Sequence, residues 1–154
     1  MTKRTQSLDI GSILRILPHK PPAVLVDAVI DLNPGKKIMA VKNITANEPC
    51  MNGHFPDLPV FPAAMLIESM IQACSILAYA TDQFDSGKQV VSLVGVNKTK
   101  FKRAIIPGDV VEIEGTLTQK RSNVWRFNVR CFVDDFMVAE SGLVLSVNSR
   151  DDII

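Results

Sequence analysis

The chain has 154 residues, of which 47% are hydrophobic and 21% charged, and this composition is typical of one globular domain over residues 1–154. The formal net charge of +1 argues against a nucleic-acid or membrane-surface binder, because such proteins usually carry a strong basic excess. Three separated cysteines without a C-x-x-C pair, together with two histidines, argue against a metal site and favour reduced thiols in a cytoplasmic protein.

The first part of the chain predicts a helix followed by a hairpin. Residues 1–7 carry basic side chains without an apolar stretch, so no secretory signal is expected there. Apolar residues over 8–16 predict a short amphipathic helix that Pro18 ends. The β-branched residues of 23–32 predict a strand, Asn33-Pro34-Gly35-Lys36 fits a type II turn, and 37–45 returns as the partner strand.

A Pro-rich loop over 46–62 precedes a long apolar segment, 63–81, which lacks Gly and Pro and therefore predicts a helix. Prolines and polar residues interrupt the apolar run, so a buried core helix is favoured over a membrane span. One polar stripe follows the helix at spacings of 4, 3 and 4 residues: Glu68, Gln72, Ser75 and Tyr79.

The remainder predicts strands over 89–96, 97–104, 110–120, 123–133 and 136–147, with turns at 107–109 and 134–135 and a tail at 148–154. A hairpin, a buried helix and an antiparallel meander form an α+β arrangement. A sheet that curls around the helix would bury it on most sides.

Glu68 is the one charged side chain in residues 58–81, and His54 precedes its helix. An ionised carboxylate is costly in apolar surroundings, so this pairing suggests acid–base chemistry. A Cys50–His54 nucleophilic pair is a weaker alternative because nothing nearby supplies a third orienting group. His19, the other histidine, is interpreted as structural, as are Ser75 and Tyr79, and Met65 and Met70 are assigned to the core.

Several motifs spell a known pattern: Leu17-Pro18-His19, Asn47-Glu48-Pro49, Gly53-His54-Phe55-Pro56, Glu68-Ser69-Met70-Ile71-Gln72 and Pro107-Gly108-Asp109. Between about residues 10 and 147 the chain resembles the 3-hydroxyacyl-acyl-carrier-protein dehydratases of type II fatty acid synthesis, in the branch with Glu on the helix. The resemblance implies a hot-dog fold and dehydration of a 3-hydroxyacyl thioester to the trans-2-enoyl thioester, without a cofactor. It also implies acyl carrier protein as the partner, and a homodimer or trimer of dimers.

The resemblance makes His54 the base at the α-carbon and Glu68 the acid that helps the hydroxyl leave, from different subunits. A neutral imidazole and a protonated carboxyl are sufficient for the dehydration if burial raises the pKa of Glu68. The enolate oxygen needs donors, and free N–H groups at the helix start, Ala63 and Ala64, can supply them. Five further residues are predicted to line or support the substrate site: Cys50, Gly53, Phe55, Phe61 and Gln72.

Basic residues cluster near residue 100. On a regular strand Lys98, Lys100 and Lys102 would share one face, with Arg103 beside them. The cluster is either a solvated strand face or a docking patch for the acidic carrier protein that the resemblance implies.

The departures from the family pattern lie around the site. Cys50 replaces a usual aromatic residue, Phe61 a usual Met, and Ala63 the Gly whose N–H contacts the thioester carbonyl. These changes suggest a specialised dehydratase with an altered acyl pocket, from a secondary-metabolite pathway. Isomerisation of the enoyl product is not expected. A weakly catalytic partner subunit that binds carrier protein, and a hot-dog thioesterase, are the alternatives; a histidine in place of a water-activating carboxylate argues against the thioesterase.

Overall fold

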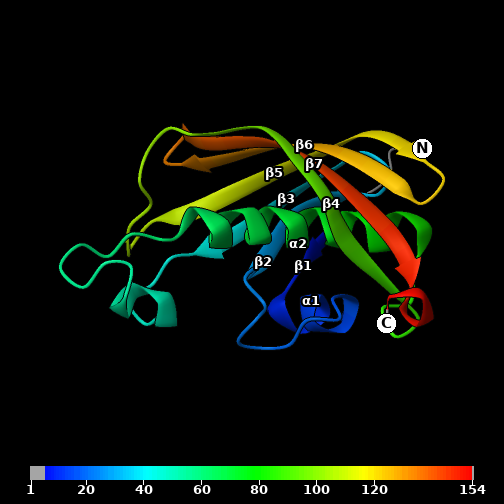
Figure 1. Cartoon of the computed structure of the whole chain (residues 1–154), viewed down its shortest axis with the longest axis horizontal. Coiled ribbons are helices and arrows are strands. Elements are labelled where there is room, and N and C mark those ends of the chain that lie inside the picture. The colour runs from blue at the N-terminus through cyan, green and yellow to red at the C-terminus, as the bar shows by residue number, and fades with distance from the viewer. Residues whose placement is uncertain (1–5, 154) are drawn as a thin grey trace.

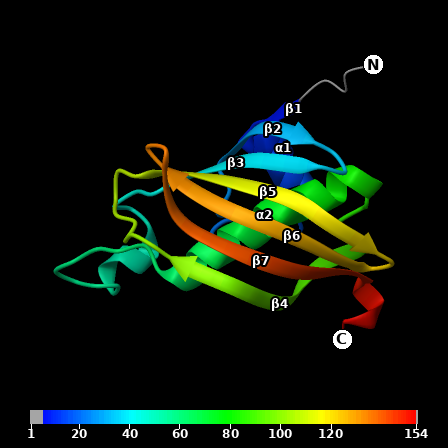
Figure 2. The same ribbon diagram turned by 90° about the horizontal axis from the view of Figure 1, so that it is seen from above.

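One long helix, α2 (Ala63–Asp82), organises the molecule, and an antiparallel sheet wraps over it (Figures 1 and 2). The computed structural model describes residues 6–153, so the expectation about a leader in residues 1–7 falls mostly outside the described part. Every residue from Ser69 to Tyr79 is buried, because the sheet covers one side of α2 and other segments cover the rest. Length and composition would allow α2 to span a membrane, but 67% of that apolar window is buried inside the protein, as a core helix requires.

The sheet has the strand order β1-β2-β3-β5-β6-β7-β4, and all neighbours are antiparallel. The strands are β1 (Gln6–Leu8), β2 (Ala28–Asn33), β3 (Lys37–Asn43), β4 (Gln89–Phe101), β5 (Val110–Arg121), β6 (Val124–Val133) and β7 (Phe136–Ser149). The sequence predicted the β2–β3 turn correctly: Lys36 N–H donates to Asn33 O at 3.0 Å, and Gly35 has φ of +79°.

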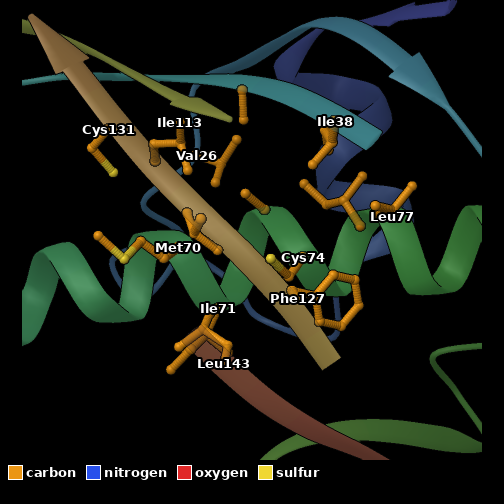
Figure 3. Packing of buried hydrophobic residues seen from close by; sticks show 14 of the residues in the cluster. Val26, Ile38, Met70, Ile71, Cys74, Leu77, Ile113, Phe127, Cys131 and Leu143 are labelled. Atoms are coloured by element: carbon orange, nitrogen blue, oxygen red, sulfur yellow. The ribbon is translucent and has the colours of Figure 1, made fainter. Parts of the chain in front are cut away.

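The core lies between α2 and the concave face of the sheet (Figure 3). Met70, Cys74 and Leu77 point from α2 towards side chains of β3, β5 and β6. Gly115 of β5 lies close to α2, since an added Cβ there would lie 3.2 Å from Cys74 Sγ. The short helix α1 (Ile10–Ile16) lies on the opposite side of α2 from the sheet (Figure 1).

Four predicted boundaries were wrong. Leu8 belongs to β1, and α1 begins after Asp9, whose carboxylate caps Ser12 N–H at 2.8 Å. Residues 23–27 are not a strand, because a side chain of α2 takes up part of their backbone hydrogen bonding. The predicted strands 89–96 and 97–104 are one strand, β4, with two bulges, and the predicted tail continues β7 to Ser149 before the 3-10 helix η2 (Arg150–Asp152).

Candidate active site

The loop before α2 holds His54 in a defined orientation. A 3-10 turn, η1 (Pro49–Asn52), comes first, and Cys50 O accepts the N–H of His54 at 3.1 Å. The ring Nδ1 lies 2.8 Å from Val60 O. A carbonyl oxygen can only accept a hydrogen bond, so Nδ1 carries the proton and the neutral ring keeps its lone pair on Nε2. Local backbone contacts thus set the tautomer that a general base needs.

A buried lysine side chain contacts both ends of this loop. The side chain of Lys42, on β3, is only 5% exposed and pairs with Glu48 at the start of η1. Its Nζ also donates to Asn43 O at 2.9 Å and lies 5.8 Å from the ring centroid of Phe61, at the end of the loop. Because an unpaired buried charge is costly, the Lys42–Glu48 pair restricts the loop that carries His54.

His54 lines a hollow of about 380 Å³ at the start of α2. The lining combines residues from the loop, the helix and the segment after β4: His54, Val60, Phe61, Ala63, Leu66, Phe101, Lys102, Arg103, Ala104 and Ile105. Helix α2 begins at Ala63 without a side-chain cap, and the first N–H within the helix to bond back is that of Met65, to Pro62 O. The N–H groups of Ala63 and Ala64 therefore remain available to an oxyanion at this end.

Glu68 does not line this hollow; its side chain, 40% exposed, meets His19 and Gln72 instead. Gln72 Nε2 donates to Glu68 Oε1 at 2.9 Å, and His19 Nε2 lies 3.4 Å from the same oxygen. The hydrogen bond from His19 outweighs burial and, with that from Gln72, lowers the pKa of Glu68 below its usual range. The expectation that burial would raise this pKa was therefore wrong for the single chain, and His19, interpreted as structural, contacts the predicted acid.

The other predicted lining residues do not line the hollow. Phe55 stacks on the His54 ring with centroids 4.2 Å apart and is 52% exposed. Gly53 ends η1, Ala64 is exposed at the helix start, and Gln72 is buried beside Glu68. Burial and the nearby Glu48 raise the pKa of the Cys50 thiol, which argues against a Cys50 nucleophile.

The basic cluster does not share one face, contrary to the prediction. A bulge separates Asn97 from Lys100, and Lys98 has a positive φ of 49°, so the simple alternation of a strand is lost. Lys98 and Lys100 border a second hollow with Arg130 and Glu140, whereas Lys102 and Arg103 line the hollow of His54.

Sequence reasoning missed several contributors to the site, among them Val60, whose carbonyl orients the His54 ring. Leu66 and Phe101 complete the apolar wall of the hollow, and Lys42 orders the loop. Leu66 and Phe101 carry no chemical signal in the sequence. A lysine in an apolar strand, six residues before Glu48, was a signal that could have been followed.

Strand β4 forms one edge of the sheet and is unusually apolar for an edge. Its residues Leu93, Val94 and Val96 are 44%, 60% and 39% exposed. An exposed apolar edge is a ready surface for pairing with another chain.

The arrangement of a long helix inside an antiparallel sheet is a hot-dog fold, and two solved structures share it. The dehydratase heterocomplex ApeI:P from Xenorhabdus doucetiae superposes with a TM-score of 0.79 and 19% identity, covering 92% of this chain and 93% of that one. The E. coli PaaI protein from the phenylacetic acid degradation operon superposes with a TM-score of 0.60 and 12% identity, covering 77% and 80%.

Sequence similarity then narrows the class to a family. A FabA-like domain matches residues 17–141. The 3-hydroxyacyl-[acyl-carrier-protein] dehydratase FabZ of Myxococcus xanthus is 39% identical over 94% of both chains, and that of Psychromonas ingrahamii is 40% identical over 92% of this chain and 94% of its own. The chain belongs to the FabZ family of 3-hydroxyacyl-acyl-carrier-protein dehydratases.

Proposed function

We propose that this protein removes water from a 3-hydroxyacyl thioester on acyl carrier protein, with His54 as the base and Glu68 as the acid. The observation that carries the proposal is the His54 tautomer: Val60 O binds Nδ1–H, so Nε2 is left to take the α-proton beside the hollow. Ala63 lines the same hollow, and its free N–H is available for the thioester oxygen as the enolate forms. Membership of the FabZ family supports the reaction.

The second member of the pair is expected from another copy of the chain. Within one chain Glu68 does not line the hollow of His54. A complete site therefore needs Glu68 of another copy to reach this hollow. The apolar edge of β4 supports a homodimer, which can assemble further into a trimer of dimers. We place the assembly in the cytoplasm, where the free thiols of Cys50, Cys74 and Cys131 would stay reduced.

A turnover assay separates this proposal from its alternatives. Given a 3-hydroxyacyl thioester, a dehydratase forms the conjugated enoyl thioester and leaves the thioester bond intact. Release of free thiol would instead indicate a thioesterase. Carrier-protein binding without any reaction would indicate a partner subunit.

The basic residues at the mouth of the hollow predict carrier-protein docking. Exposed Lys102 and Arg103 line it, whereas the exposed Lys98 and Lys100 border the second hollow on β4. We expect Lys102→Glu with Arg103→Glu to raise KM severalfold for the carrier-bound substrate, because like charges slow the encounter, and to leave KM for a small thioester nearly unchanged.

Lys36→Glu is the matched control for docking, since Lys36 is exposed at a turn packed on Thr81, near the far end of α2. Added salt should mimic the Lys102/Arg103 variant only with carrier-bound substrate. Equal sensitivity of both substrates to salt would exclude the docking role.

The acyl pocket predicts a narrowed substrate range, consistent with a specialised, secondary-metabolite member of the family. Phe61 and Ala63 both line the hollow. Phe61 is bulkier than the Met, and Ala63 is bulkier than the Gly, that the family usually has at these positions. We expect the wild type to prefer a limited set of acyl groups, and Phe61→Met with Ala63→Gly to broaden it. A chain-length series of carrier-bound substrates measures this, and a broad straight-chain profile in the wild type would contradict it.

A further inference from the structure

The carboxylate of Glu68 is held from one side. Both side chains that contact it reach Oε1: Gln72 Nε2 donates to this oxygen at 2.9 Å, and His19 Nε2 lies 3.4 Å from it. Within residues 6–153 no donor contacts Oε2. Glu68 therefore has one oxygen engaged by the protein and one that remains free.

The orientation of Gln72 is fixed by the backbone of the segment that follows His19. Gln72 is fully buried; its Oε1 accepts the N–H of Leu25 at 2.8 Å, and its Nε2 donates to Ala23 O at 2.8 Å. Flipping the amide would break both bonds and turn an oxygen towards Glu68. Gln72 is thus a permanent donor to Oε1, and it anchors residues 23–25 to α2.

The tautomer of His19 follows from its other nitrogen. Nδ1 is buried and has no hydrogen-bond partner among the described residues. A proton on Nδ1 would be a buried, unsatisfied donor, so the neutral ring carries its proton on Nε2, which faces Glu68. His19 is therefore built as a second donor to the same oxygen.

We propose that His19 is a positioning residue of the acid–base site, which with Gln72 holds Oε1 of Glu68 and leaves Oε2 as the oxygen presented to substrate, a role that rests on the proposed function of Glu68. The two contacts come from different elements, the loop after α1 and α2 itself, so they hold Oε1 from two directions. Gln72 carries no charge. Besides His19, the titratable group that we expect to face Glu68 is His54 of a second copy.

This role predicts a pH effect with a defined sign. Donors to Oε1 favour the carboxylate and lower the pKa of Glu68. Dehydration needs Glu68 protonated and its base neutral. An ordinary carboxyl titrates about two units below an imidazole, so this active form is a minor species whose kcat/KM falls below the lower pKa, and the acidic limb reports Glu68. Loss of the His19 donor should raise the pKa of Glu68 and move that limb to higher pH, whereas a merely structural loss would lower the whole profile without moving it.

The test is a ¹³C NMR titration of the Glu68 carboxyl, assigned with Glu68→Gln, combined with pH profiles of kcat/KM. We expect His19→Ala to shift the titration and the acidic limb upward together. His19→Gln, whose amide nitrogen reaches the position of Nε2, should keep both near the wild-type values. Lys20→Met, a change at the neighbouring exposed residue, is the matched control and should move neither.

An unchanged Glu68 titration in folded His19→Ala would overturn the role of His19. If that variant does not fold, ¹⁵N NMR of the wild type decides: a proton on Nε2 of His19 supports the proposal and a proton on Nδ1 overturns it. Absence of dehydration by the wild type would refute the proposed function, and the titration would still decide the contact between His19 and Glu68.

Discussion

Replacing either member of the acid–base pair should lower kcat for dehydration by on the order of a hundredfold or more, because a positioned acid or base contributes about that much. The variants are His54→Ala and Glu68→Gln, measured by the absorbance of the enoyl thioester. The His54→Ala variant lacks the Nε2 lone pair that takes the α-proton, and the Glu68→Gln variant lacks the acidic proton that the leaving hydroxyl needs.

Glu112→Gln, at an exposed carboxylate on β5, is the matched control and should keep wild-type activity. Circular dichroism and thermal unfolding show whether each variant is folded. Near wild-type turnover by a folded His54→Ala or Glu68→Gln protein would remove that residue from the mechanism.

Two inactive variants should regain activity when they are combined in one dimer. If each site takes His54 from one copy and Glu68 from the other, a heterodimer of His54→Ala and Glu68→Gln chains contains one intact site and one doubly altered site. Random pairing of co-expressed chains should therefore restore about a quarter of the wild-type activity, from simple two-fold symmetry.

Purification of the heterodimer with two different affinity tags raises the expectation to about half of the wild-type activity per dimer. The homodimers of each variant, purified in the same way, are the controls. If the purified heterodimer were as inactive as the homodimers, both residues would have to act within one chain, contrary to the placement of Glu68 outside the hollow.

Local sequence signals predicted the elements that local chemistry determines. Helix α2 extends one residue beyond its predicted end, because no Gly or Pro interrupts it until Gln83 adopts the left-handed conformation, with φ of 52°. The turn at Gly35 follows from Pro and Gly at fixed positions. The Pro-rich composition of residues 46–62 placed His54 correctly on a loop before the start of this helix.

Contacts between distant residues account for most of what was missed. The backbone of Leu25 bonds to Gln72, 47 residues away, so β-branched composition alone wrongly predicted a strand there. The apolar neighbours of Glu68 in the sequence suggested a raised pKa, but the donor that lowers it is His19, which lies outside that helix. Similarly, the alternation of side chains along residues 97–103 gives no sign of the bulge near Lys98.

The most direct test of the account is hydration of a trans-2-enoyl thioester on acyl carrier protein in deuterium oxide, followed by mass spectrometry. The reaction run in this direction must place the proton of the base on the α-carbon. If His54 is the base, the wild type gives a 3-hydroxyacyl product with deuterium at the α-carbon and an intact thioester, and His54→Ala gives no product. Release of free thiol, or an enoyl thioester that the wild type leaves unchanged, would contradict it.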